Sequence, residues 1–293
     1  MMMLRSYLFL SLALLQQALA FMLPTTASKT HRTGLQATTA DAQPAIIESS
    51  DICDSSTNVE HSGPRLIFPG GGLFFYWQAG VISYLQEEGY NLSTAHLSGA
   101  SAGALSATLA ATGVDFYEAT ELALSLSEEA GVWDRPLGLQ GIWGDMIHTW
   151  LDELLPHDAD EMVSEKLHIL VTPVPSFGKQ KINKFETRED LIHANMASVH
   201  LPWFLNGDLT KKFRGQSVID GSFFAKPSDY FDKEKHVDAL ILDYKRDPVL
   251  RERSTDFVNP GKGKQFIWDI LEQGKRHAQI MDKQGEFRIL QQQ

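Results

Sequence analysis

A serine flanked by small residues is the first feature of this sequence that could do chemistry. Gly99 and Gly103 enclose Ser101 in the segment GASAG, which fits the G-x-S-x-G pattern of a nucleophile elbow. In such an elbow a strand turns so tightly into a helix that only small residues fit beside the serine, whose hydroxyl is left exposed. Apolar residues precede the segment and an alanine-rich stretch follows it. The pattern therefore predicts a nucleophile at Ser101.

Three consecutive glycines, Gly70, Gly71 and Gly72, lie before the serine motif. Glycines let backbone N–H groups approach one anionic atom without steric obstruction, and attack by a serine creates such an atom, the oxyanion of a tetrahedral intermediate. We expect this loop and the N–H of Ala102 to form an oxyanion hole. A phosphate-binding loop is the alternative, but no Lys-Ser or Lys-Thr follows, and Phe75 breaks the G-x-G-x-x-G pattern.

An acid that could serve as the base follows later in the chain. Asp220-Gly221 comes directly after the short apolar segment 217–219. Asp-Gly is also a common turn pair, so these two residues have a purely structural interpretation when they are taken alone.

Alternating strand and helix patterns must position these residues. Residues 65–68 and 92–97 are predicted strands, and each precedes a predicted helix, at 76–89 and 102–111 respectively. Such a unit favours an α/β fold with a parallel sheet. Further along, we expect helices at 115–130, 142–155 and 265–282, and strands at 166–174, 217–219 and 239–244. The first of these helices begins at Asp115 with Glu118 as a capping box.

Composition limits the class of protein. The 293 residues are 43% hydrophobic, which is enough to form one full core, and the net charge is −11. So acidic a chain is a poor match to a polyphosphate backbone, so we expect no nucleic-acid partner. The single cysteine, Cys53, excludes an internal disulfide and a cysteine-rich zinc site.

The first forty residues predict a targeting sequence. Residues 1–20 have the basic start, short apolar run and Ala-Leu-Ala ending of a signal peptide. Residues 21–40 begin with Phe21, are rich in Ser, Thr and Ala, and contain basic but no acidic residues. Together they resemble the bipartite presequence that delivers proteins to complex plastids (chloroplasts), and secretion is the alternative. We expect a disordered linker at 41–63 and one folded domain at 64–293.

Four segments together resemble the patatin-like phospholipase family: PGGGLFFYWQAG at 69–80, GASAG at 99–103, ASVHLPWFL at 197–205 and VIDGSF at 218–223. The resemblance extends from about residue 65 to residue 244. It implies a three-layer α/β/α fold with a mostly parallel central sheet. It also implies a Ser–Asp dyad without a catalytic histidine, in which Ser101 is the nucleophile, Asp220 the base and Gly221 the following turn residue.

Two departures from the family pattern leave alternatives open. Family members often have a basic residue and a glycine after the triple glycine, where this chain has Phe74 and Phe75, and their Asp-Gly is commonly followed by Gly or Ala rather than by Ser222. A catalytically weak, lipid-binding homologue is therefore one alternative. A Ser-Asp-His triad of the α/β-hydrolase type is another, with His236 or His277 after the acid.

The resemblance implies hydrolysis of acyl esters in membrane glycerolipids, either phospholipids or galactolipids, at a membrane surface. No cofactor or metal is required, and no protein partner can be predicted. Acyl chains need an apolar slot, and several aromatic residues lie beside the motifs in sequence, although core packing is the other interpretation of them. The candidate acyl-binding residues are Phe74, Phe75, Trp203, Phe204 and Phe223.

Overall fold

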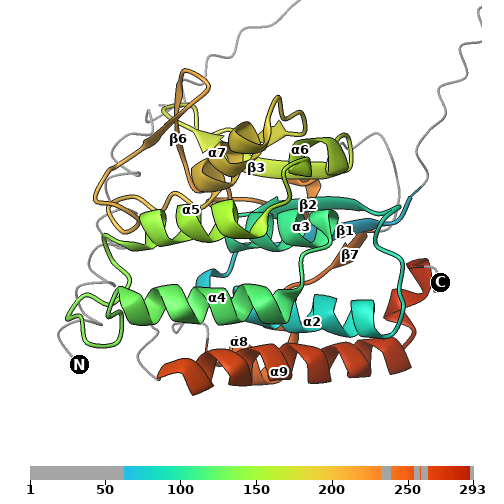
Figure 1. Ribbon diagram of the computed structural model, residues 1–293. Helices are drawn as coiled ribbons and strands as arrows, with labels where there is room; N and C mark the ends of the chain where they lie inside the picture. The colour runs from blue at the N-terminus through green and yellow to red at the C-terminus, as the bar shows by residue number, and fades with distance from the viewer. Residues whose placement is uncertain (1–62, 232–238, 254–257, 259–262, 291–293) are drawn as a thin grey trace, which may run out of the picture. The chain divides into compact units, whose positions relative to one another are not determined.

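The computed structural model describes residues 63–231, 239–253, 258 and 263–290 (Figure 1). The predicted signal peptide, the transit-like segment and nearly all of the predicted linker lie outside the described residues. His236, a candidate base of the triad alternative, also lies outside them. The described helices include none that is both long and apolar enough to cross a membrane.

Within the described residues, seven strands form one mixed sheet in the order β5-β6-β3-β2-β1-β7, and β4 pairs with β3 off this path. The pairs β1–β2, β1–β7 and β2–β3 are parallel, while β3–β4, β3–β6 and β5–β6 are antiparallel. The strands are β1 (Arg65–Phe68), β2 (His96–Ala100), β3 (Leu167–Pro173), β4 (Gln180–Ile182), β5 (Lys211–Phe213), β6 (Gln216–Ile219) and β7 (Ala239–Ile241).

The helices pack around this sheet (Figure 1). The α-helices are α2 (Phe75–Glu87), α3 (Ala102–Thr112), α4 (Phe116–Glu129), α5 (Trp143–Leu154), α6 (Ala159–Met162), α7 (Arg188–Ser198), α8 (Pro248–Arg251) and α9 (Gly263–Lys283). Short 3-10 helices are η1 (Gly72–Phe74), η2 (Pro227–Asp229), η3 (Tyr244–Arg246) and η5 (Glu286–Ile289).

The two faces of the sheet bury different amounts of apolar surface. Successive strand residues point to opposite faces, so Leu66 and Phe68 join the main core with the α-helices, whereas Ile67 points the other way. On that second face a smaller cluster forms around Tyr230, which follows η2. The chain therefore has an α/β fold with a mixed sheet, in which β7, β1, β2 and β3 run parallel, and helical segments on both sides, which confirms the expected fold class.

Helices α2 and α9 lie side by side and pack closely because glycines face the neighbouring backbone (Figure 1). A Cβ atom at Gly80 would lie 1.9 Å from the carbonyl oxygen of Leu271, and one at Gly274 would lie 2.0 Å from that of Trp77. Real Cβ atoms do not come so close, so each glycine is required by the approach of the two backbones rather than by its own dihedral angles.

Most predicted elements are confirmed, with two kinds of difference. The second strand was placed too early, because it begins at His96 rather than at residue 92. The residues before it form a turn in which the Asn91 side chain accepts a hydrogen bond from Ser93 N (2.8 Å). Helix α7 and strands β4 and β5 were not predicted. Nearly all of the second half of α7 is buried, so it lacks the one-sided apolar periodicity that identifies a surface helix.

Replacing Gly274 by Ala tests the close packing of α2 and α9. Alanine favours a helix by about 1 kcal/mol over glycine, but overpacking of a tight contact typically costs about 1–3 kcal/mol. We expect G274A to lower the free energy of unfolding, measured by urea denaturation. Glu272→Ala, at an exposed position of the same helix, should leave it nearly unchanged. A G274A protein as stable as the wild type would contradict this packing.

Candidate active site

Ser101 occupies a strained turn between β2 and α3. Its φ of 56° and ψ of −131° place a non-glycine residue at positive φ, a conformation that costs of order 1–3 kcal/mol and that occurs mainly at functional sites. Small residues surround it by necessity. A Cβ atom at Gly99 would lie 2.1 Å from the Gly103 carbonyl oxygen, and one at Gly103 would lie 1.9 Å from that of Phe68. This is the geometry of a nucleophile elbow.

The last residue of α7 holds the elbow in place. Ser198 Oγ accepts a hydrogen bond from Ser101 N (2.9 Å) and donates one to the carbonyl oxygen of Leu170 in β3 (2.7 Å). The Ser198 carbonyl oxygen in turn accepts from Gly221 N (2.9 Å). One serine therefore connects the nucleophile turn, the central sheet and the Asp-Gly turn. The sequence analysis assigned no role to it.

Asp220 is completely buried next to this turn. Its Oδ1 accepts hydrogen bonds from Ser222 N (2.7 Å) and Ser222 Oγ (2.6 Å), whereas its buried Oδ2 has no partner of normal hydrogen-bond geometry among the described residues. Burial raises the pKa of Asp220, although the Ser101 hydroxyl, Ser222 and the charge of Lys179 act in the opposite direction. Oδ2 is thus the oxygen of Asp220 that Ser222 leaves unoccupied.

Lys179 holds the backbone of the Asp220 turn through hydrogen bonds. Its Nζ donates hydrogen bonds to Thr172 Oγ1 (2.7 Å), to the carbonyl oxygen of Gly221 (3.2 Å) and to that of Phe223. Thr172 Oγ1 donates to the backbone oxygen of Asp220 (2.9 Å). Burial lowers the pKa of Lys179 to about 8, with Asp220 opposing that change. No sequence motif identified Lys179, because its partners lie in other elements.

The glycine loop lies against both reactive residues. A Cβ atom at Gly70 would lie 2.7 Å from Ser222 Cβ and 3.0 Å from Ser101 Cβ. Gly72 has a φ of 55°, which favours glycine, and it lines the same cavity as Ser101. The structure therefore brings the predicted loop, the nucleophile and the aspartate turn together in one place.

An apolar cavity that is partly open to solvent lies at Ser101. Ser101 and Ala102 form part of its wall, and α4 and α5 each supply four of the other lining residues. Its large apolar lining residues include Leu105, Trp133, Trp143, Met146, Ile147 and Trp150. A pocket with so apolar a lining suits the hydrocarbon part of a lipid. None of these six residues was predicted as acyl-binding.

The two phenylalanines after the glycine loop point in different directions. Phe75 lines the cavity and meets Trp150 edge to face, with ring centroids 5.4 Å apart. Phe74 is buried outside the cavity lining and packs against Tyr244, with centroids 4.3 Å apart. Of this pair, the cavity wall therefore contains Phe75 alone.

The other predicted acyl-binding residues lie outside the cavity lining. Phe204 packs edge to face on Trp143, with ring centroids 5.8 Å apart, and so supports the wall from behind. Trp203 is 42% exposed at the surface. Phe223 pairs with Phe224, which is itself 64% exposed.

His277, a candidate base of the triad alternative, is engaged elsewhere. Its Nδ1 lies 3.7 Å from Asp247 Oδ2, and its ring lies 5.4 Å from that of Trp77. Burial lowers the pKa of His277, and Asp247 opposes that change. These contacts direct His277, on α9, toward α2 and the residues that follow β7, and it is not part of the cavity wall.

Sequence comparison assigns the class of protein. The profile of the family described as patatin-like phospholipase matches residues 66–232, from β1 to beyond the Asp220 turn. The chain belongs to the patatin-like phospholipase family, which confirms the resemblance seen in the motifs.

Particular relatives match about half of the chain. Omega-hydroxyceramide transacylase from Mus musculus is 30% identical over 159 residues, which are 53% of this chain and 26% of that protein. Patatin-like phospholipase domain-containing protein 2 from Homo sapiens is 33% identical over 160 residues, which are 54% of this chain and 32% of that protein. The matched segment thus spans less than a third of these two relatives. A crystal structure of VipD from Legionella pneumophila aligns with a TM-score of 0.34 and 14% identity, covering 58% of this chain and 48% of that chain.

Asp220→Asn tests the electrostatic state of the site. Burial raises the pKa of Asp220, so the folded protein favours the protonated carboxyl. The contribution of this group to stability is complete below its unfolded pKa of about 3.9. That contribution is lost as pH rises through the folded pKa. Asparagine cannot ionise and keeps an Oδ1 for Ser222. We expect D220N to have a higher melting temperature than the wild type at pH 8, and this difference should shrink towards pH 4.

A second buried carboxylate provides the control for this measurement. Asp247 accepts hydrogen bonds from Trp77 Nε1 (3.1 Å) and Gln273 Nε2 (2.9 Å), so its charge is well satisfied. Asp247→Asn should therefore not raise the melting temperature at pH 8. A D220N protein that is less stable than the wild type at pH 8 would contradict the proposed cost of ionising the buried Asp220.

Proposed function

We propose that this protein is a serine lipid acyl hydrolase that cleaves carboxylic ester bonds of membrane glycerolipids through an acyl-enzyme on Ser101. One observation carries the proposal: a strained serine at the wall of an apolar cavity lies beside a buried carboxylate whose free oxygen has no other described partner. Membership of the patatin-like phospholipase family supports it.

The proposed reaction begins with attack of Ser101 Oγ on the ester carbonyl carbon while Asp220 Oδ2 accepts the serine proton. The N–H groups of the glycine loop and of Ala102 would hold the oxyanion, and losing one such donor typically costs about 3 kcal/mol. Collapse of the intermediate breaks the ester bond, and the departing alcohol takes the proton from Asp220. Water then attacks the acyl-enzyme by the same route. A raised pKa makes Asp220 a better base than an ordinary carboxylate near neutral pH.

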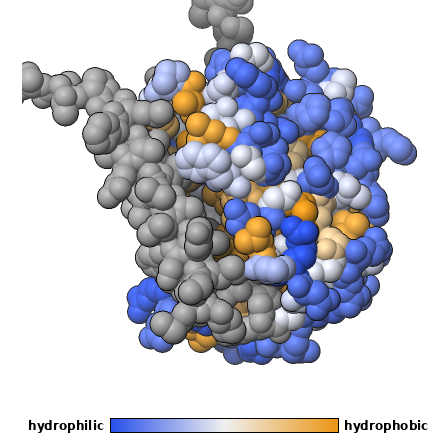
Figure 2. All heavy atoms as spheres, turned by 90° about the vertical axis from the view of Figure 1, so that its left-hand side faces the viewer, coloured by the Kyte–Doolittle hydropathy of each residue, from blue (hydrophilic) through white to orange (hydrophobic). Residues whose placement is uncertain are grey.

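The cavity supports a lipid substrate, because its wall would surround an acyl chain while the ester lies at Ser101. Each CH₂ group buried there contributes about 0.8 kcal/mol to binding. Membrane contact would rest on apolar side chains, since the net charge of −11 does not favour anionic surfaces. Trp203, Leu209 and Phe224 are exposed on the segments around β5 and β6. Figure 2 shows hydrophobic residues as small separate groups on one face.

A transacylase is the second candidate, in which a lipid hydroxyl replaces water as the acyl acceptor. The observation that favours it is the identity of 30% with omega-hydroxyceramide transacylase, together with an apolar cavity that limits water around the acyl-enzyme. The first half of the reaction, acylation of Ser101, is the same in both. Plastid delivery, inferred from residues 1–40, would make galactolipids the substrates that the protein encounters.

A lipid panel tests the reaction. Phosphatidylcholine and monogalactosyldiacylglycerol vesicles should release free fatty acid with the wild-type protein, followed by mass spectrometry, and added diacylglycerol reports transfer to a hydroxyl. Ser101→Ala should lower either product about 10³-fold or more. Ser125→Ala, at an exposed serine of α4, is the matched control and should not. Lipid binding by the wild type without any product would favour a lipid-binding homologue over an enzyme.

Leu105→Trp tests the acyl cavity, because Leu105 lies on α3 in the cavity wall and is almost fully buried. We expect the larger side chain to lower kcat/KM for long-chain p-nitrophenyl esters while short-chain esters are cleaved nearly as before. If each excluded CH₂ removes about 0.8 kcal/mol, the loss grows steeply with chain length. An equal loss for every chain length would show that the acyl chain binds elsewhere.

A further inference from the structure

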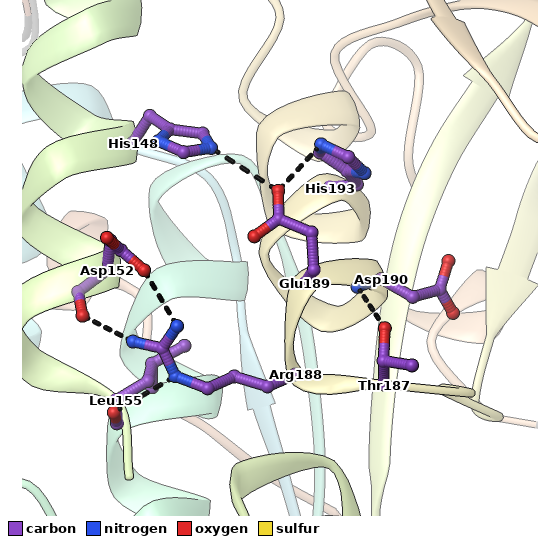
Figure 3. A network of polar contacts seen from close by, with 8 residues as sticks. All are labelled: His148, Asp152, Leu155, Thr187, Arg188, Glu189, Asp190 and His193. Atoms are coloured by element: carbon purple, nitrogen blue, oxygen red, sulfur yellow. Dashed lines mark hydrogen bonds and ion pairs between the residues drawn. The ribbon is translucent and has the colours of Figure 1, made fainter. Parts of the chain in front are cut away.

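Two helices present a group of metal-ligating side chains on the outside of the molecule. His148 comes from α5, and Glu189 and His193 come from α7 one helical turn apart (Figure 3). His148 Nε2 lies 3.6 Å from Glu189 Oε1, and His193 Nε2 lies 2.9 Å from the same oxygen. The candidate ligand atoms of the three residues all lie within 4.8 Å of one another.

This arrangement has the composition and spacing of a transition-metal site. Two imidazoles and one carboxylate are ligands of Zn²⁺, which binds nitrogen at about 2.0–2.1 Å and carboxylate oxygen at about 2.0–2.2 Å. Tetrahedral ligands at such distances lie roughly 3.4 Å apart, so small side-chain rotations would bring all three onto one ion. The three side chains are about half exposed, so a fourth ligand can be water.

The cluster is separate from the candidate active site. None of its residues lines the apolar cavity, although the neighbouring Ile147 does. Close by, Arg188 of α7 donates hydrogen bonds to Asp152 Oδ1 (2.7 Å) and to the Leu155 carbonyl oxygen (3.2 Å) (Figure 3). That ion pair already joins the two helices, and it leaves Glu189 as the carboxylate for the two histidines.

We propose that His148, Glu189 and His193 bind one Zn²⁺ ion that cross-links α5 to α7. The consequence for the fold is specific, because α5 forms much of the cavity wall and α7 ends at Ser198, which holds the Ser101 turn. The ion fixes the cavity wall relative to the elbow and plays no part in bond breaking. The sequence analysis expected no metal and did not single out these residues; only Glu189 and His193 are close in the chain, and His148 belongs to another helix.

Isothermal titration of the purified, metal-free protein with ZnCl₂ tests the proposal. We expect saturable binding of one ion per chain and a higher melting temperature with Zn²⁺. Loss of a residue that only supports a metal ligand typically weakens binding roughly 10- to 100-fold. His148→Ala and His193→Ala remove ligands themselves, so each should weaken Zn²⁺ binding by at least that much. These side chains are exposed, so the variants should fold. His157→Ala, at an exposed histidine outside the cluster, is the matched control and should bind like the wild type.

Cobalt gives a second readout that does not depend on heat. Co²⁺ in a site with few ligands absorbs visible light more strongly than the aqueous ion, and Glu189→Gln should remove that band as the histidine variants do. Two results would overturn the proposal: a wild-type protein that binds neither ion saturably, or cluster variants that bind Zn²⁺ as tightly as His157→Ala does.

Discussion

The burial of one carboxylate beside a serine is the constraint on which the rest of this structure depends. Asp220 is fully buried, and its Oδ2 faces no described hydrogen-bond donor of normal geometry. Ionising a carboxylate in such a place costs free energy, because the charge has lost the hydration that stabilises it in water. The raised pKa of Asp220 reflects this cost. The same cost makes the Asp220 carboxylate a stronger proton acceptor. The burial that destabilises the fold is therefore also what the proposed reaction requires.

The surrounding elements offset that cost and fix the geometry. Ser222 supplies two hydrogen bonds to Oδ1, while Lys179, directly before β4, holds the backbone of the same turn and brings a positive charge near it. Ser198 connects this turn to the Ser101 elbow through its side chain and its carbonyl oxygen. A backbone strained at Ser101 persists only where its neighbours overdetermine it, and these contacts are the ones that do so. Ser222, a departure from the common family pattern, therefore has a defined electrostatic role.

Local patterns in the sequence were sufficient for some of these features and not for others. The elbow was predictable, since the tight turn demands small residues at fixed offsets from Ser101, and α3 begins where that turn ends. Asp220 was identified only from the order of motifs, because an Asp-Gly pair alone is a common turn. Ser198 and Lys179 act on residues far away in the chain, so nothing in their own neighbourhoods indicated these roles.

The acyl cavity illustrates the same limit. Closeness in sequence to the glycine loop suggested both Phe74 and Phe75, but adjacent residues at the start of a helix point in different directions, and the cavity wall contains only the second. Two of its other aromatic residues, Trp143 and Trp150, come from α5, which no motif connects with Ser101. Which side chains line a cavity depends on how helices pack, and this information is long-range.

Labelling with a fluorescent fluorophosphonate tests the central claim most directly, because this reagent reacts only with an activated serine. The Ser–Asp dyad predicts that the wild-type protein is labelled at Ser101, that Ser101→Ala is not labelled, that Asp220→Asn is labelled far more slowly, and that His277→Ala and His236→Ala react like the wild type. Absence of labelling in a folded wild-type protein, or its loss in either histidine variant, would contradict the dyad.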